Sequence, residues 1–245
     1  MRGRTLDGTE DVMAFSPYAR ILSSRVYRSL WLGQVVSNFG DTLHYVALVV
    51  LLFRLTGSGA TLAALSLAQI VVGLVLGPAA GVLVDRLDRR TVMIAADVLR
   101  AALAAALAFT VHAPLAIALA VGMTAAGVPF RPAAQAMIPS LVDEADLLAA
   151  NSVGWSTEQA TQIVASAVAG AMLATWGTTP AFLINAASFL FSAGMLLGVP
   201  RRPGRLKAEG QGALADFWHD ARDGLTYARR DAFIGPLLLI QGLSL

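Results

Sequence analysis

The segment GVLVDRLDRR, residues 81–90, places five charged side chains between two long apolar stretches. The stretch before it covers about residues 61–84, and the stretch after it covers about residues 92–111. Each has about the 20 residues that a helix needs to cross a bilayer. A short charged segment between two such stretches is typical of a loop that joins two transmembrane helices at a membrane surface. The chain around this loop therefore has the pattern of a membrane protein.

The composition excludes several classes of protein. Of the 245 residues, 56% are hydrophobic and only 14% are charged, which argues against a soluble fold. The chain has no cysteine and three scattered histidines, so we expect neither a disulfide framework nor a metal site, and no cofactor. The net charge of +2 comes from separate basic clusters, which do not form a nucleic-acid interface. No pairing of catalytic residues such as HExxH or GxSxG is present, so we do not expect an enzyme.

Hydropathy and turn residues predict six membrane crossings in an all-α fold. The predicted spans cover approximately residues 30–53, 61–84, 92–111, 115–138, 151–175 and 181–199. Pro129 and Pro132 lie inside the fourth span and predict a kink there. A seventh apolar segment begins near residue 233, but only about ten residues follow Pro236, so we expect an incomplete seventh helix on the roughly 20-residue requirement.

The distribution of basic residues predicts the orientation. Nearly all of the 18 Lys and Arg residues fall on the side of the N-terminus, whereas Arg54 is the exception on the other side. The positive-inside rule places that side in the cytoplasm of a multi-pass protein of the cell membrane, with the lipid bilayer as its first partner. The predicted domains are a cytoplasmic tail (residues 1–28), a six-helix bundle (29–199), a cytoplasmic linker with an amphipathic helix (200–231) and the start of a seventh helix (232–245).

The charged loop and several other segments carry a family resemblance. The pattern GxLxDRxxRR resembles the GxLADRxGRR signature of the major facilitator superfamily; the matching residues are Gly81, Leu83, Asp85, Arg86, Arg89 and Arg90. Asp88 stands where the signature has glycine. Four further segments resemble the drug and siderophore exporter branch: WLGQVVSNFGD (31–41), PAAQAMIPSLVDEADLLAANS (132–152), FLINAASFLFSAG (182–194) and DGLTYARRD (223–231).

The resemblance implies a twelve-helix transporter built from two six-helix halves with a central site between them. This chain would be the N-terminal half together with an incomplete seventh helix. The implied function is secondary active efflux of small amphipathic molecules, with protons as the coupled partner. The GPxxGG motif of many antiporters is absent from the fifth span, where residues 165–170 read ASAVAG. The alternative is a truncated or degenerate membrane protein, or a half that requires a second six-helix chain.

The first span carries a polar face. Its members recur at steps of three and four residues and are Gln34, Ser37, Asn38, Asp41, His44 and Tyr45. Asp41 lies roughly 16 Å along the span, close to the middle of the bilayer. We interpret Asp41 as a proton acceptor and His44, one turn away, as a residue that shares the proton. The alternative is a polar contact between helices.

Other polar residues inside the spans extend the candidate site. Asp97 and Arg100 are three residues apart and are expected to form an intramembrane ion pair. Arg131 is a candidate partner for Asp85, or else extends to the lipid headgroups. Glu158 is a candidate for a second proton or for a cationic substrate, or else makes a packing contact.

Uncharged polar residues and glycines complete these predictions. Gln34, Asn38, Gln69, Gln162 and Asn185 are candidates to line the cavity, although single amides also join helices. In the loop, Gly81, Asp85, Arg86, Arg89 and Arg90 are predicted to gate the cytoplasmic mouth through salt bridges. The alternative, that the arginines only fix the topology, leaves Asp85 unexplained. The four-residue spacing of Gly73, Gly77 and Gly81 predicts close packing of the second span against a neighbour.

Overall fold

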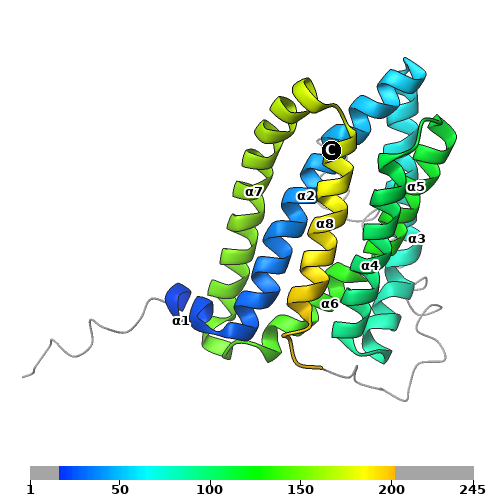
Figure 1. The fold of residues 1–245 in the computed structure, drawn as a ribbon. Helices are drawn as coiled ribbons and strands as arrows, with labels where there is room; N and C mark the ends of the chain where they lie inside the picture. Colours follow the sequence, from blue (N-terminus) through cyan, green and yellow to red (C-terminus); the bar gives the residue numbers. More distant parts are fainter. Residues whose placement is uncertain (1–16, 202–245) are drawn as a thin grey trace, which may run out of the picture.

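The computed structural model describes residues 17–201, and every regular element in this range is a helix. The helices are α1 (Pro17–Ser23), α2 (Arg25–Thr56), α3 (Gly59–Arg86), α4 (Arg89–Ala108), α5 (Ala113–Gly127), α6 (Phe130–Met137), α7 (Leu147–Trp176) and α8 (Thr179–Leu196). Two short 3₁₀ turns, Ile138–Ser140 and Glu144–Asp146, lie between α6 and α7. The long helices stand side by side in one bundle (Figure 1). The predicted linker beyond its first two residues, and the predicted start of the seventh helix, lie outside the described residues.

Five helical units in the described part of the chain are long and apolar enough to cross a membrane. They are α2, α3, α4, the combined segment Ala113–Ser140, and α8. The fifth predicted crossing corresponds to α7, which has 30 residues and packs against α2, but which carries many polar side chains in its first half. The prediction of an all-α membrane fold is confirmed.

The helix ends follow local sequence signals. Gly57 and Gly177 adopt positive φ values of 62° and 76°, a conformation that glycine tolerates, and they end α2 and α7. The fourth crossing breaks between α5 and α6, and Pro129 occupies the break. The kink predicted from the prolines is therefore confirmed. Asp88 caps α4, since its carboxylate accepts a hydrogen bond of 2.9 Å from the backbone N–H of Thr91.

The closest helix contact joins α2 to α8. A Cβ atom added at Gly40 would lie 2.6 Å from the Oδ1 atom of Asn185 and 2.9 Å from the Cβ atom of Ser188. One added at Gly33, two turns earlier, would lie 3.3 Å from the Oγ atom of Ser192. Small residues on both helices allow this approach, as is common where membrane helices pack. The interface fixes the position of α2 within the bundle.

The predicted close packing through the α3 glycines is wrong within the described residues. Nothing lies within 4 Å of a Cβ atom added at Gly73, Gly77 or Gly81. The helix packs instead through another face, on which the Nε2 atom of Gln69 donates a 3.0 Å hydrogen bond to the Oγ1 atom of Thr124 on α5. Regular spacing of small residues indicates a face that permits close approach, but it does not identify a neighbour.

Candidate functional site

A cavity of about 820 Å³ opens between α2, α6 and α7, with one residue from α4 in its wall. Its polar lining includes Gln34, Ser37, Asn38, Asp41, Arg100, Arg131, Gln135, Glu158 and Gln162, and its aromatic lining includes Tyr27, Trp31, Tyr45, Phe130 and Trp155. The polar face predicted for the first span therefore lines the cavity, with the exception of His44. Because charged side chains avoid the lipid, this wall must face water or protein.

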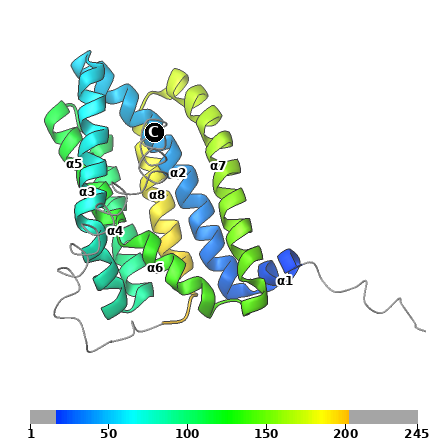
Figure 2. The ribbon, with the colours of Figure 1, turned by 180° about the vertical axis from the view of Figure 1, so that it is seen from behind.

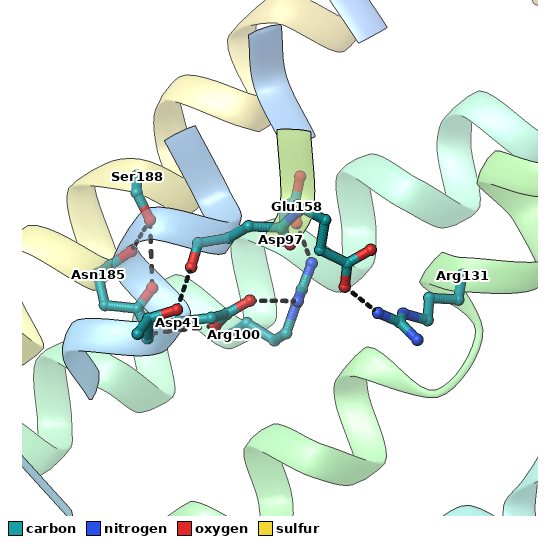
Figure 3. Close-up of polar contacts among 9 residues, drawn as sticks. Asp41, Asp97, Arg100, Arg131, Glu158, Asn185 and Ser188 are labelled. Atoms are coloured by element: carbon teal, nitrogen blue, oxygen red, sulfur yellow. Dashed lines mark hydrogen bonds and ion pairs between the residues drawn. The ribbon is translucent and has the colours of Figure 1, made fainter. Parts of the chain in front are cut away.

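Asp41 is the acidic residue of α2 that faces the cavity, and 40% of its side chain is exposed there. Its Oδ1 atom accepts a hydrogen bond of 3.4 Å from the Nδ2 atom of Asn185 on α8. Its Oδ2 atom lies 3.7 Å from the Nη1 atom of Arg100 on α4. Figure 3 shows these groups around the carboxylate. The ionised acid thus has a cation and an amide donor nearby and still faces the cavity.

The predicted ion pair between Asp97 and Arg100 is present in the structure. Asp97 is fully buried, and its Oδ1 atom accepts a hydrogen bond from the Nη2 atom of Arg100. Arg100 therefore contacts two carboxylates at once, one on its own helix and Asp41 on α2. Spacing along one helix predicts the first contact, whereas the second depends on the packing of two helices.

The partner of Arg131 differs from the one that the sequence suggested. Arg131, on α6, forms an ion pair and a hydrogen bond with Glu158 on α7 (Figure 3), in place of the predicted Asp85 or lipid headgroups. Both side chains line the cavity. The pair therefore joins two helices across the cavity wall.

Three further candidates lie away from the cavity lining. His44 is buried against Phe182 of α8, with 5.2 Å between the ring centroids in an edge-to-face arrangement. Gln69 donates a hydrogen bond to Thr124 and so joins α3 to α5, which is the helix-joining role that single amides can also have. Asn185 is completely buried and reaches the site only through its bond to Asp41. Periodicity placed His44 on the polar face, but its ring turns toward α8.

The charged loop is short and ordered. Gly81, Asp85 and Arg86 lie in the last turns of α3, and Arg89 and Arg90 begin α4. Arg89 donates a 2.7 Å hydrogen bond from Nη1 to the carbonyl oxygen of Ala136 near the end of α6. This bond ties the loop to the kinked fourth crossing. The gating role of these residues remains a prediction.

One contact was not foreseen from the sequence. The guanidinium of Arg20 on α1 donates two hydrogen bonds, of 2.7 and 2.5 Å, to the carboxylate of Asp146 just before α7. The hydrogen bond and the charge of Arg20 hold the pKa of the Asp146 carboxyl below its usual value. Two other hydrogen bonds join α2 to α7. The Tyr27 hydroxyl donates one of 2.9 Å to the carbonyl oxygen of Ala150, and the Trp31 indole N–H donates one of 3.3 Å to the hydroxyl of Thr157.

These contacts place α1 beside the beginning of α7, at the end of the bundle that carries the charged loop (Figures 1 and 2). Arg20 and Asp146 are 126 residues apart in sequence, so no local pattern could have paired them. Within residues 17–201, no group of three or more His, Cys, Asp or Glu side chains is arranged to hold a metal ion. The site can therefore be described from its carboxylates, arginines, amides and aromatic rings.

Comparison with known proteins agrees with this architecture. Residues 14–239 match the family described as transmembrane secretion effector. The chain is 29% identical over 222 residues to macrolide efflux protein A of Streptococcus pyogenes, a match that covers 89% of this chain and 54% of that protein. It is 29% identical over 213 residues to the uncharacterized MFS-type transporter YfiS of Bacillus subtilis, covering 86% and 50%. A protein of Enterococcus faecalis, also named macrolide efflux protein A, is 29% identical over 176 residues, covering 69% and 53%.

The chain thus spans about half the length of the curated relatives that it matches. The family match covers most of the chain, and it agrees with the all-helical bundle and with the charged loop between α3 and α4. The chain belongs to the transmembrane secretion effector family of the major facilitator superfamily, and it corresponds to the N-terminal half of that fold.

Proposed function

We propose that this chain forms half of a secondary active exporter, which moves small amphipathic molecules out of the cell in exchange for protons. The second six-helix half would close the open side of the cavity. The observation that carries the proposal is the position of Asp41, a carboxylate halfway along the 32-residue α2 that faces a cavity of about 820 Å³. An acid at this depth is costly to keep charged, by about 2.5–3.5 kcal/mol on insertion scales, so it is functional by default.

The surroundings of Asp41 favour exchange of a proton. Arg100 and Asn185 stabilise its ionised form, and neutralisation by a proton removes the cost of a charge at membrane depth. Since the side chain is 40% exposed to the cavity, a proton can reach it without unfolding the bundle. Asp41 can therefore alternate between two protonation states as access to the cavity alternates between the two sides.

The cavity lining suits a substrate with an apolar body and several polar groups. Aromatic rings of Trp31, Tyr45 and Trp155 offer apolar contact, and Gln34 and Gln162 offer hydrogen bonds. Two relatives are named for macrolide efflux, which makes a macrolide the first substrate class to test. Glu158 is the second candidate acid; its pairing with Arg131 must loosen if it is to bind a cationic group or a proton.

We further propose that the N-terminus lies in the cytoplasm of a cell-membrane protein and that the charged loop gates the cytoplasmic mouth. The excess of Lys and Arg on that side supports the orientation. The bond from Arg89 to Ala136 supports the gating role, because it joins the loop to the helix that carries Arg131. A movement of α6 would therefore also move the charged loop.

The test uses the chain assembled with its second half in proteoliposomes, with macrolide flux and proton flux measured together. We expect Asp41→Asn to abolish accumulation against a gradient and to retain downhill exchange, since the amide resembles the protonated acid but cannot cycle a proton. Glu158→Gln serves as the comparison within the same cavity. Unchanged coupled transport by Asp41→Asn would remove Asp41 from the mechanism and leave Glu158 as the next candidate. Transport by the 245-residue chain alone would contradict the need for a second half.

A further inference from the structure

The side chain of Arg100 is packed against residues of three other helices. Its guanidinium carbon lies 4.7 Å from the ring centroid of Phe130 on α6 and 4.2 Å from that of Phe189 on α8. A Cβ atom added at Gly127 on α5 would lie 3.4 Å from the Cδ atom of Arg100, so α5 passes directly beside the side chain. Guanidinium groups stack on aromatic faces and keep their proton in proteins. The cavity therefore contains a permanent positive charge at a fixed position.

The two carboxylates beside Arg100 differ in their contact with it. Asp97 is fully buried and is hydrogen-bonded to the Nη2 atom. Asp41 lies 3.7 Å from the Nη1 atom, which is beyond hydrogen-bond distance, and 40% of its side chain is exposed. Asp97 is thus the hydrogen-bonded partner of Arg100, whereas Asp41 is attracted to Arg100 without a hydrogen bond to it.

We propose that Arg100 is the positioning residue of the proton site. Asp97 keeps the guanidinium of Arg100 at a distance from which Arg100 attracts the Asp41 carboxylate but does not form a closed ion pair with it. The inference rests on the proposed role of Asp41 as the proton acceptor. Without Arg100, the ionised acid would lose its cation. Without Asp97, the whole charge of the arginine would be free to form a closed ion pair with Asp41, and that pair would resist protonation.

The other charged groups around Asp41 do not replace this arrangement. On α6 and α7, Arg131 and Glu158 pair with each other. The sequences of α5 and α8 contain no charged residue, and α8 contributes the neutral amide of Asn185. The charges of α3 lie in its last turn, at Asp85 and Arg86, and on α2 itself His44 turns toward Phe182. Asp97 and Arg100 are thus the charged pair next to the acid.

The test follows the protonation of Asp41 in the 245-residue chain in lipid, by infrared titration of the carbonyl band of a protonated carboxylic acid. The band is assigned by its loss in Asp41→Asn. We expect Arg100→Gln to raise the pH at half-protonation by about one unit, and Asp97→Asn to lower it by about one unit, as is usual when a charge within 4–6 Å is removed or freed. Arg100→Lys retains the charge, so its pH at half-protonation should stay close to that of the parent. Arg54→Gln, which removes an exposed cation from the end of α2, is the matched control and should cause no shift.

The outcomes separate this inference from the proposed function. If Asp41→Asn removes no titrating band, Asp41 is not a proton site, and both fail. If the band is present but Arg100→Gln and Asp97→Asn shift it in the same direction, or not at all, Arg100 is only a structural residue and the inference fails by itself. Should Arg100→Gln fail to fold, the test rests on Asp97→Asn, which should shift the band to lower pH, while Arg100→Lys stays close to the parent. Absence of an acid shift in Asp97→Asn then overturns the inference.

Discussion

Replacement of Gly40 by alanine tests whether helix packing positions the proton site. The added Cβ atom would lie 2.6 Å from the Oδ1 atom of Asn185 and 2.9 Å from the Cβ atom of Ser188, so α2 and α8 must separate. Overpacking of this kind costs about 1–3 kcal/mol, and loss of the bond from Asn185 to Asp41 costs about 1 kcal/mol. The better helix propensity of alanine returns about 1 kcal/mol. We expect a net loss of about 1–3 kcal/mol in the free energy of unfolding.

The matched control is Gly73→Ala on α3, where nothing lies within 4 Å of the new Cβ atom. In the isolated chain this change should stabilise the helix by up to about 1 kcal/mol, from propensity alone. The assay is equilibrium unfolding of the purified chain in mixed micelles, with both variants measured in parallel. If Gly40→Ala is as stable as Gly73→Ala, the close α2–α8 contact is not present in the folded protein, and the reasoning from it to Asp41 fails.

Three other changes test separate contacts. Asp88→Ala should cost about 1 kcal/mol in unfolding experiments because α4 loses its cap, whereas Asp88→Gly should cost only a few tenths of that; equal losses would contradict the capping role. Because Arg20 lowers the pKa of Asp146, the stability that this ion pair contributes is present above about pH 4 and is lost as the pH falls through the lowered pKa. Hydrogen exchange of α1, measured as a function of pH, should show this loss in the parent and not in Asp146→Asn. In the chain assembled with its second half, Asp85→Asn should reduce transport per inserted molecule and leave insertion intact. Reduced insertion with normal transport per molecule would favour a structural role.

The sequence predicted those features that depend on local patterns. The lengths of the apolar stretches indicated the helices, and Pro129 indicated the break in the fourth crossing. The polar face of α2 was predicted from its period, and Asp41 does line the cavity. Asp88 could also have been recognised as a cap, because an aspartate just before a helix, followed three residues later by the N–H it binds, is a common N-terminal signal.

The features that were not predicted depend on how helices rotate against one another. Arg131 pairs with Glu158 because α6 and α7 face the same cavity, and nothing in either segment specifies this. His44 lies within the angular range of the polar face, yet it sits at the edge nearest α8 and packs on Phe182. Glycine spacing in α3 suggested a contact that the described residues do not make. Periodicity gives the faces of each helix but not the neighbour that each face meets.

The neighbouring residues Gly40 and Asp41 link the packing of the bundle to its chemistry. They point about 100° apart around α2, so one meets α8 and the other meets the cavity. Asn185 touches both positions, since its Oδ1 atom limits the space at Gly40 and its Nδ2 atom lies 3.4 Å from Asp41. A movement between α2 and α8 would therefore disturb the acid directly, and a movement of α6 would disturb Arg100 through Phe130. A movement of α7 would change only the access of Asp41 to the cavity. We therefore expect α2, α4 and α8 to move as one unit during transport, and access to Asp41 to be controlled on the side of Arg131 and Glu158.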